Sequence, residues 1–144
     1  MGVENNIQTE KVLHAISGIY NTMHLFDLKK SACEELYAFK EVHDLFTNNK
    51  DKHDIQGIIH FIIKKTTTKE YLPALLEFTN LSNLNERLVD KKILSFDFVG
   101  AIHGWTRCSF IPVEYDEDGK IVKILYTTRR IQTDKEREEK LLDC

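Results

Sequence analysis

Three strand-like segments in the last third of the chain constrain the fold more than any other feature. Residues 92–101, 105–115 and 121–131 are rich in aromatic and β-branched residues, and the first of them alternates apolar with polar positions. The last two flank Asp116-Glu117-Asp118-Gly119, a turn sequence with glycine where a positive φ is needed. This hairpin predicts antiparallel strands at the C-terminal end of the chain.

Two more strands are predicted near the N-terminus, over residues 19–28 and 32–38, with a polar break between them. From Lys40 onward the apolar spacing becomes helical, and the widest apolar face falls on residues 54–65. Strands at both ends with helices between them predict an α+β fold, in which short helices pack on one face of an antiparallel sheet. The other helical segments are 40–49, 69–78 and a mixed stretch over 80–90.

A helix is expected at each end of this unit. Residues 9–17 are amphipathic, and Thr133 and Glu136 form a capping box that starts a second helix. That second helix is too short to be stable alone, so we expect it to continue in a longer parent protein. The predicted organisation is an N-terminal flanking helix (1–18), a sensor-sized domain (19–131) and the start of a linker helix (132–144).

Composition excludes several classes of protein. A chain of 144 residues, 42% hydrophobic and 30% charged, is typical of one soluble globular domain. The net charge of −3 provides no basic patch, so no nucleic-acid partner is expected. The longest apolar run, 58–63, is too short to span a bilayer, so no membrane contact by this segment is expected. Three widely spaced cysteines indicate reduced thiols and a cytoplasmic location.

The most specific stretch, residues 104–128, resembles the paired fourth and fifth strands of a PAS domain and their tight turn. Tyr20 to Leu28, and Gly104-Trp105 with Arg107, are similar to bacterial PAS modules that precede diguanylate cyclase or histidine kinase output domains, as in two-component systems. The resemblance implies five antiparallel strands, with short helices between the second and third. It also implies a sensory homodimer that binds a small ligand or a partner and relays its state through the C-terminal helix to a fused output domain.

The chain departs from the PAS pattern in two respects. PAS domains commonly end the fifth strand with Asp-Ile-Thr, whereas this chain has Arg130-Ile131-Gln132. Ile131 is kept, so Ile131 and the helix-capping Thr133 are the expected signal-relay residues. The cysteine motif of light-sensing flavin domains is missing, and nothing local marks His53 or His60 as a haem ligand. No cofactor is therefore identified, and neither flavin nor haem is expected.

Two groups of residues are candidates for binding. Aromatic residues of the helices and strands could line an apolar ligand pocket between the sheet and the helices. The same side chains could equally fill the core and leave no pocket. Trp105 and Arg107 lie two residues apart on a predicted strand, so their side chains share a face. We expect them either to bind an anionic ligand or a partner, or to pack beneath a neighbouring helix. The pocket candidates are Phe61, Phe78, Phe96, Phe98 and Tyr126.

No catalytic or metal site is predicted. Cys108 has no recognisable base, and the six histidines include no His-Glu-x-x-His pair. The leading hypothesis is a non-enzymatic sensory module. The alternative is a ligand-free dimerisation or docking scaffold, followed by a small enzyme using a histidine and a carboxylate in the same cavity.

Overall fold

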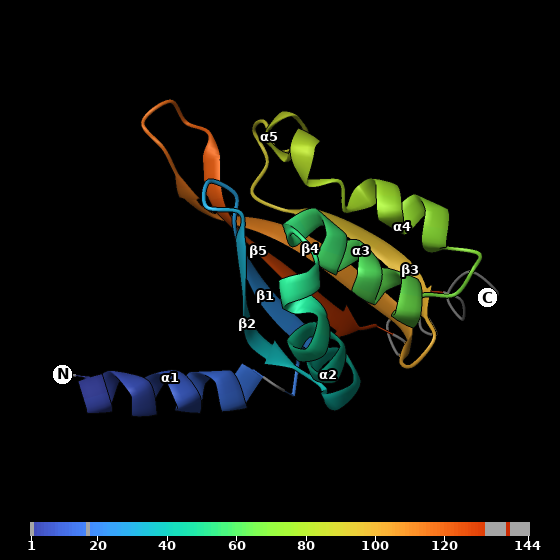
Figure 1. Ribbon diagram of the computed structural model, residues 1–144, viewed down its shortest axis with the longest axis horizontal. Helices are drawn as coiled ribbons and strands as arrows, with labels where there is room; N and C mark the ends of the chain where they lie inside the picture. Colours follow the sequence, from blue (N-terminus) through green and yellow to red (C-terminus); the bar gives the residue numbers. More distant parts are fainter. Residues whose placement is uncertain (1, 17, 132–137, 139–144) are drawn as a thin grey trace.

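The computed structural model describes residues 2–16, 18–131 and 138. Its centre is a five-stranded sheet in the order β2-β1-β5-β4-β3, in which every neighbouring pair is antiparallel (Figure 1). The first and last strands are therefore neighbours in the middle of the sheet. The strands are β1 (Thr22–Asp27), β2 (Ala32–Ala38), β3 (Leu94–Gly100), β4 (Gly104–Tyr115) and β5 (Ile121–Arg130).

All helices between the second and third strands lie on one face of the sheet (Figure 1). The predicted α+β, PAS-like arrangement is therefore confirmed. These elements are α2 (Lys40–Asn49), the 3-10 turn η1 (Lys50–Lys52), α3 (Ile55–Thr66), α4 (Leu72–Phe78), η2 (Leu81–Asn83) and α5 (Leu84–Arg87).

Two of the hairpin turns in the sheet are held by an aspartate side chain. In the β4–β5 turn, Gly119 takes φ +80° and the Asp116 carboxylate accepts the backbone N–H groups of Asp118 and Lys120, each at 2.9 Å. In the β1–β2 turn, the Asp27 carboxylate accepts hydrogen bonds from the backbone N–H groups of Lys29 and Lys30. Each turn thus satisfies its own backbone donors through an aspartate.

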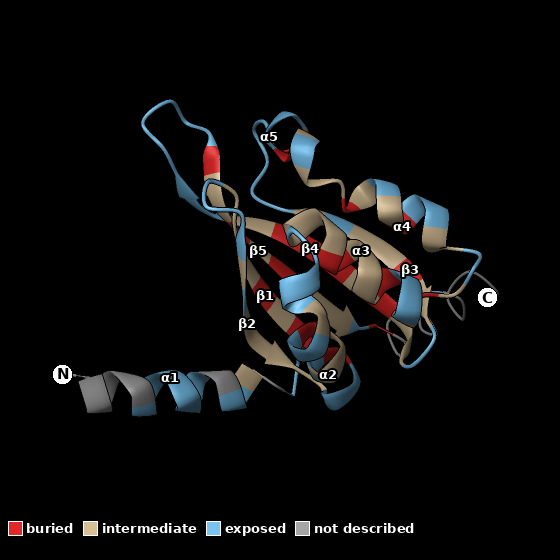
Figure 2. Cartoon of the chain, in the orientation of Figure 1, coloured by how far each residue is buried: buried red, intermediate tan, exposed pale blue. Residues whose placement is uncertain are grey.

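The core fills the space between the sheet and the helices, where Figure 2 shows buried residues on the facing surfaces. Alternate residues of β4 point inward, and Cys108 and Phe110 are fully buried. From the other side α3 contributes Ile59 and Ile63, and α4 contributes the fully buried Leu75.

The third predicted helix begins later than the sequence indicated. Residues 69–71 precede α4, and Pro73 lies in the first turn of that helix. The preceding Thr67 forms a β-bridge with Gly100, and the Thr68 N–H donates to Val99 O. These hydrogen bonds to β3 hold the chain out of a helix, so tertiary pairing overrides the local helical spacing.

The N-terminal helix α1 (Gly2–Ile16) starts well before the predicted residue 9, because its first half is polar and carries no periodic signal. Figure 1 shows it extending away from the sheet. Its residues Ile7 and Val12 are 48% and 50% exposed. No helix among the described residues has the length and apolarity needed to cross a bilayer.

The predicted linker helix falls outside the described residues except at Glu138, which is helical. Thr133 is among the residues that are not described. The described chain leaves the sheet at Ile131, which is 2% exposed and donates its N–H to Trp105 O at 3.0 Å.

Candidate functional site

The candidate site is a cavity of about 70 Å³ between the inner face of the sheet and helices α2 and α3. Its body is apolar, with Phe26, Phe98 and Tyr126 on the sheet side. The helices add five aliphatic side chains and one further ring. These are Val42, Phe46, Ile58, Ile59, Ile62 and Ile63.

Most polar residues of the cavity lie toward one end of the strands, where β1 and β4 begin and β3 and β5 end. Thr22 and Thr128 face each other there, with their hydroxyl oxygens 2.7 Å apart. Because these two hydroxyls bond to each other, they are already satisfied.

Thr67, at the C-terminal end of α3, is the middle one of three consecutive threonines. Its hydroxyl differs from the other two in its hydrogen bonding. Thr66 Oγ1 donates to Ile62 O at 2.9 Å, and Thr68 Oγ1 donates to Val99 O at 3.0 Å. Thr67 is only 9% exposed, and its Oγ1 is buried without a hydrogen-bond partner among the described residues. Thr67 is one of the residues that line the cavity, although its buried Oγ1 is not exposed to that space.

His103, another residue that lines the cavity, has a second buried atom without a partner among the described residues. It lies in the short turn between β3 and β4, and its ring packs edge-on against Phe39, with centroids 4.5 Å apart. Its Nε2 is buried and, within the described part of the chain, has no hydrogen-bond partner. Buried polar atoms are nearly always paired, so Thr67 and His103 are the exceptions that need an explanation.

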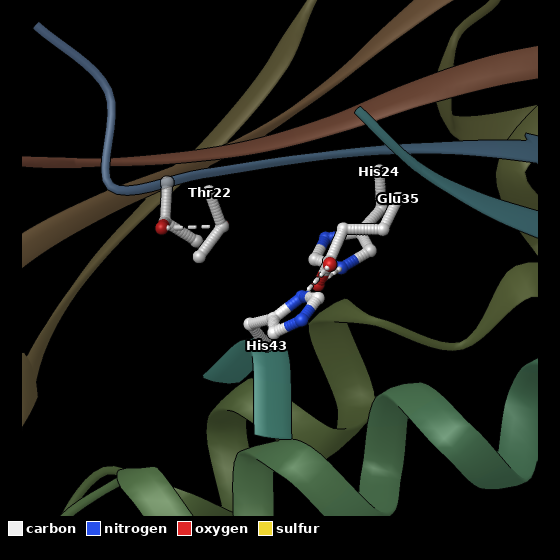
Figure 3. A network of polar contacts seen from close by, with 5 residues as sticks. Thr22, His24, Glu35 and His43 are labelled. Carbon is white, nitrogen blue, oxygen red and sulfur yellow. Dashed lines mark hydrogen bonds and ion pairs between the residues drawn. The ribbon is translucent and has the colours of Figure 1, made fainter. Parts of the chain in front are cut away.

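A histidine–glutamate–histidine network borders the cavity (Figure 3). Glu35 of β2 lies between His24 of β1 and His43 of α2, with Oε1 3.1 Å from His24 Nε2 and Oε2 2.5 Å from His43 Nδ1. His24 lines the cavity and packs against the Phe46 ring at 5.1 Å. The network therefore connects the cavity wall to helix α2.

The environment of Glu35 changes its acidity. Burial raises the pKa of the Glu35 carboxyl, but the hydrogen bonds and charges of His24 and His43 together outweigh burial and leave the pKa below the ordinary value of 4.5. A carboxyl with a lowered pKa in the folded state stabilises the fold above the pKa of the unfolded state. That contribution is lost as the pH falls through the lower, folded value.

We expect Glu35→Gln to lower the free energy of unfolding by about 1–2 kcal/mol at neutral pH, because it removes a charged acceptor of two hydrogen bonds. The loss should shrink as the pH falls from 4.5 through the lower pKa of the folded state, because the wild-type carboxyl becomes protonated over that range. Urea unfolding followed over pH checks this. Glu34→Gln, an exposed neighbour on the same strand, is the control, and equal pH profiles for the two variants would contradict the prediction.

The structure divides the five aromatic pocket candidates. Phe98 and Tyr126 line the cavity, whereas Phe78 and Phe96 stack on each other, with centroids 5.4 Å apart, in a filled part of the core. Phe61 lies apart from the cavity, beside the His53 ring at 5.1 Å. The cavity and the stacked Phe78–Phe96 pair therefore lie in different parts of the interior.

Trp105 and Arg107 do not line the cavity. Trp105 makes an edge contact with Tyr71, at 5.7 Å between centroids. Arg107 makes a two-pronged ion pair with Asp97 of β3, through Nε at 2.7 Å and Nη2 at 3.0 Å. An anionic ligand at Arg107 would compete with this pair.

Cys33, Cys108 and His60 are poorly suited to nucleophilic or ligand chemistry. Burial is the main cause that raises the pKa of Cys33 and of Cys108, each to about 12, so both remain protonated thiols at neutral pH. His60 Nε2 lies 3.1 Å from Leu76 O, and burial lowers the pKa of its ring. Within the residues that can be described, no cluster of three or more histidine, cysteine or acidic side chains could hold a metal ion.

Sequence reasoning missed His24, Thr67 and His103 as site residues. His24 carried a usable signal: it lies on a strand whose hairpin partner contains Glu35, and the β1–β2 register pairs these two residues. Thr67 and His103 carried none, because a lone threonine or histidine in a turn is ordinary in composition.

The described architecture defines the class of the domain: a PAS-like α+β fold with five antiparallel strands and helices between the second and third. The chain is similar to a domain of a proposed light- and redox-sensing histidine kinase from Haloarcula marismortui, with TM-score 0.48, 13% identity and coverage of 85% of this chain and 99% of that one. It is also similar to the PAS domain of BvgS from Bordetella pertussis, with TM-score 0.44, 19% identity and coverage of 94% and 95%. No protein-family model and no curated protein sequence matches the chain.

Proposed function

We propose that the chain is a sensory module of a signal-transduction protein, which binds a small molecule in the cavity between the sheet and helices α2 and α3. The observation that carries the proposal is the cavity itself, a largely apolar space whose lining also includes polar side chains such as those of Thr22, His24 and Thr128. A hollow with convergent polar groups is the usual form of a small-molecule site. We assign no catalytic role to it.

Strand β5 offers a route for the signal. Tyr126 and Thr128 line the cavity, and three residues further on the buried Ile131 leads into the C-terminal segment. A ligand that shifts β5 would therefore also shift the start of that segment, with Ile131 and Thr133 as the relay. In this proposal the segment continues into a fused diguanylate cyclase or histidine kinase domain in the cytoplasm.

A homodimer is the second part of the proposal. The half-exposed Ile7 and Val12 on the projecting helix α1 are suited to contact with a second copy of the chain. Two copies related by twofold symmetry would bring the same apolar positions together. The pairing of the copies would then be the property that the ligand changes.

The small size of the cavity favours a second candidate function. A space of about 70 Å³ holds only a few non-hydrogen atoms, so a module that works without a ligand, as a dimerisation or docking scaffold, fits it too. The two functions differ in one measurable respect, the presence of a bound molecule.

Native mass spectrometry of the freshly purified chain tests both. The sensor proposal predicts a dimer whose mass exceeds twice the chain mass by that of one or two small molecules, one for each occupied cavity, which are lost on denaturation. A dimer of bare chains would favour the scaffold, and monomers at every concentration in light scattering would contradict the dimer in either form.

A further inference from the structure

We propose that the cavity selects a small, uncharged and apolar molecule of up to about five non-hydrogen atoms, and excludes polar or charged molecules of the same shape. This inference rests on the proposed ligand-binding function and specifies the chemistry of the ligand. It starts from the side chains that line the cavity and from the hydrogen bonds that their polar atoms already make.

The body of the cavity consists of hydrocarbon groups. Five aromatic rings and six aliphatic side chains line it, and they come from both layers of the domain. Phe98 belongs to the sheet, Phe46 to α2 and Ile59 to α3. A water molecule in such a space finds few of the polar partners that it needs, so an apolar molecule displaces little bound water. It also gains dispersion contacts that the walls otherwise lack.

The lining carries no charge that could hold an ionic ligand. Among the described residues that line the cavity there is no lysine, arginine, aspartate or glutamate. The Glu35 carboxylate is not part of the lining and is bonded to His24 and His43. A charged molecule would therefore lose its hydration without gaining a counter-ion in the cavity.

Four of the five threonines that line the cavity have hydrogen-bonded hydroxyls. Thr22 and Thr128 bond to each other, with 2.7 Å between their oxygens. Thr66 Oγ1 donates to a backbone carbonyl one helical turn back at 2.9 Å, and Thr106 Oγ1 donates to Gly104 O at 3.0 Å. These hydroxyls gain little from a polar ligand, because they already have partners.

Four further polar side chains also offer little to a ligand. Thr67 Oγ1 and His103 Nε2 have essentially no accessible surface, so a molecule in the cavity does not reach them. The Tyr126 hydroxyl is hydrogen-bonded to the Cys108 thiol, and His24 engages its Nε2 in the network with Glu35. A polar ligand would leave its own donors and acceptors unpaired, which weakens its binding.

The two polar side chains that remain are Cys33 and Asn21. A buried thiol is a weak hydrogen-bonding group and packs as a small apolar side chain. Asn21 is half-buried and accepts the Phe39 N–H through its backbone carbonyl, at the end of the cavity where the lining residue Ile102 is 45% exposed. Water competes for the Asn21 amide there, so the deeper part of the cavity favours an apolar molecule.

The test uses three five-membered rings of nearly the same shape. Cyclopentane is apolar, tetrahydrofuran carries one acceptor, and pyrrolidine carries a charged ammonium group at neutral pH. Amide chemical shifts of the ¹⁵N-labelled chain are followed during titration with each ring. We expect cyclopentane to perturb amides around the cavity, such as those of Ile59 and Phe98, and to leave Leu75 unchanged. Cyclopentane should bind at least roughly tenfold more tightly than tetrahydrofuran, and pyrrolidine should leave the cavity unperturbed.

A variant of Phe46 tests the size limit. Phe46 is 5% exposed and lines the cavity from α2, so Phe46→Leu enlarges the space and should raise the affinity for cyclohexane at least roughly fivefold. The matched control is Phe78→Leu, because Phe78 stacks on Phe96 and does not line the cavity. It removes the same ring and should leave the affinity for cyclohexane unchanged.

The outcomes separate this inference from the sensor proposal. If tetrahydrofuran or pyrrolidine binds in the cavity as tightly as cyclopentane, or if native mass spectrometry identifies a charged molecule retained by the chain, the apolar preference is wrong while a ligand-binding sensor stands. An equal gain for Phe46→Leu and Phe78→Leu would contradict the size limit. If no ring perturbs the cavity and the native mass shows a bare chain, this inference and the ligand-binding function both fail.

Discussion

Replacing Phe110 by alanine should lower the free energy of unfolding by about 3–5 kcal/mol, the largest single effect we expect in this chain. Phe110 is fully buried on β4, and its ring lies 5.5 Å from Phe78 and 5.0 Å from Tyr126, between centroids. The three rings join the packed end of the interior to the wall of the cavity. Removing the middle ring leaves a hole in close-packed material, and the loss of contacts adds to the loss of burial.

Urea unfolding monitored by circular dichroism measures this loss. Val113→Ala is the matched control, because Val113 lies on the same strand and is 56% exposed, so its truncation should change stability by less than about 0.5 kcal/mol. A loss of less than about 1 kcal/mol for Phe110→Ala would mean that the sheet and helices are not packed at this point as described.

Val42→Phe should abolish binding at the cavity, with at least a roughly hundredfold loss of affinity for a small molecule that binds there, because the added ring occupies the space itself. Val42 is 5% exposed and faces the cavity from α2. Enlarging a side chain beside a hollow adds apolar contacts without displacing neighbours. The free energy of unfolding should therefore stay within about 1 kcal/mol of the wild-type value or rise.

The same enlargement in the packed end should have the opposite effect on stability. Leu75 is fully buried on α4 and does not line the cavity, so Leu75→Phe should cost about 1–3 kcal/mol through overpacking. Titration for binding and urea unfolding for stability are measured on both variants. An equal loss of stability for Val42→Phe and Leu75→Phe would show that the space near Val42 is filled.

Much of the secondary structure could be predicted because its causes are local. The β2 segment 32–38, the long hairpin ending at the turn 116–119, and the buried face of α3 all follow from residue spacing within a few positions. The predicted start of α4, at residue 69, was wrong. Thr67 and Thr68 pair with β3, about 30 residues further along the chain, and this distant pairing prevents the helix from starting there.

The sequence by itself determined the α+β class, the hairpins at the two ends of the domain and the buried face of α3, since periodicity and turn chemistry act within single elements. Only the tertiary structure decided which polar side chains meet inside the domain and where the interior is left hollow. The Thr22–Thr128 pair joins residues 106 apart in the chain, and the bridging of His24 and His43 by Glu35 requires three elements to meet. The position of the cavity depends on how those elements pack, and so does which of three consecutive threonines has no hydroxyl partner among the described residues. No local pattern encodes either feature.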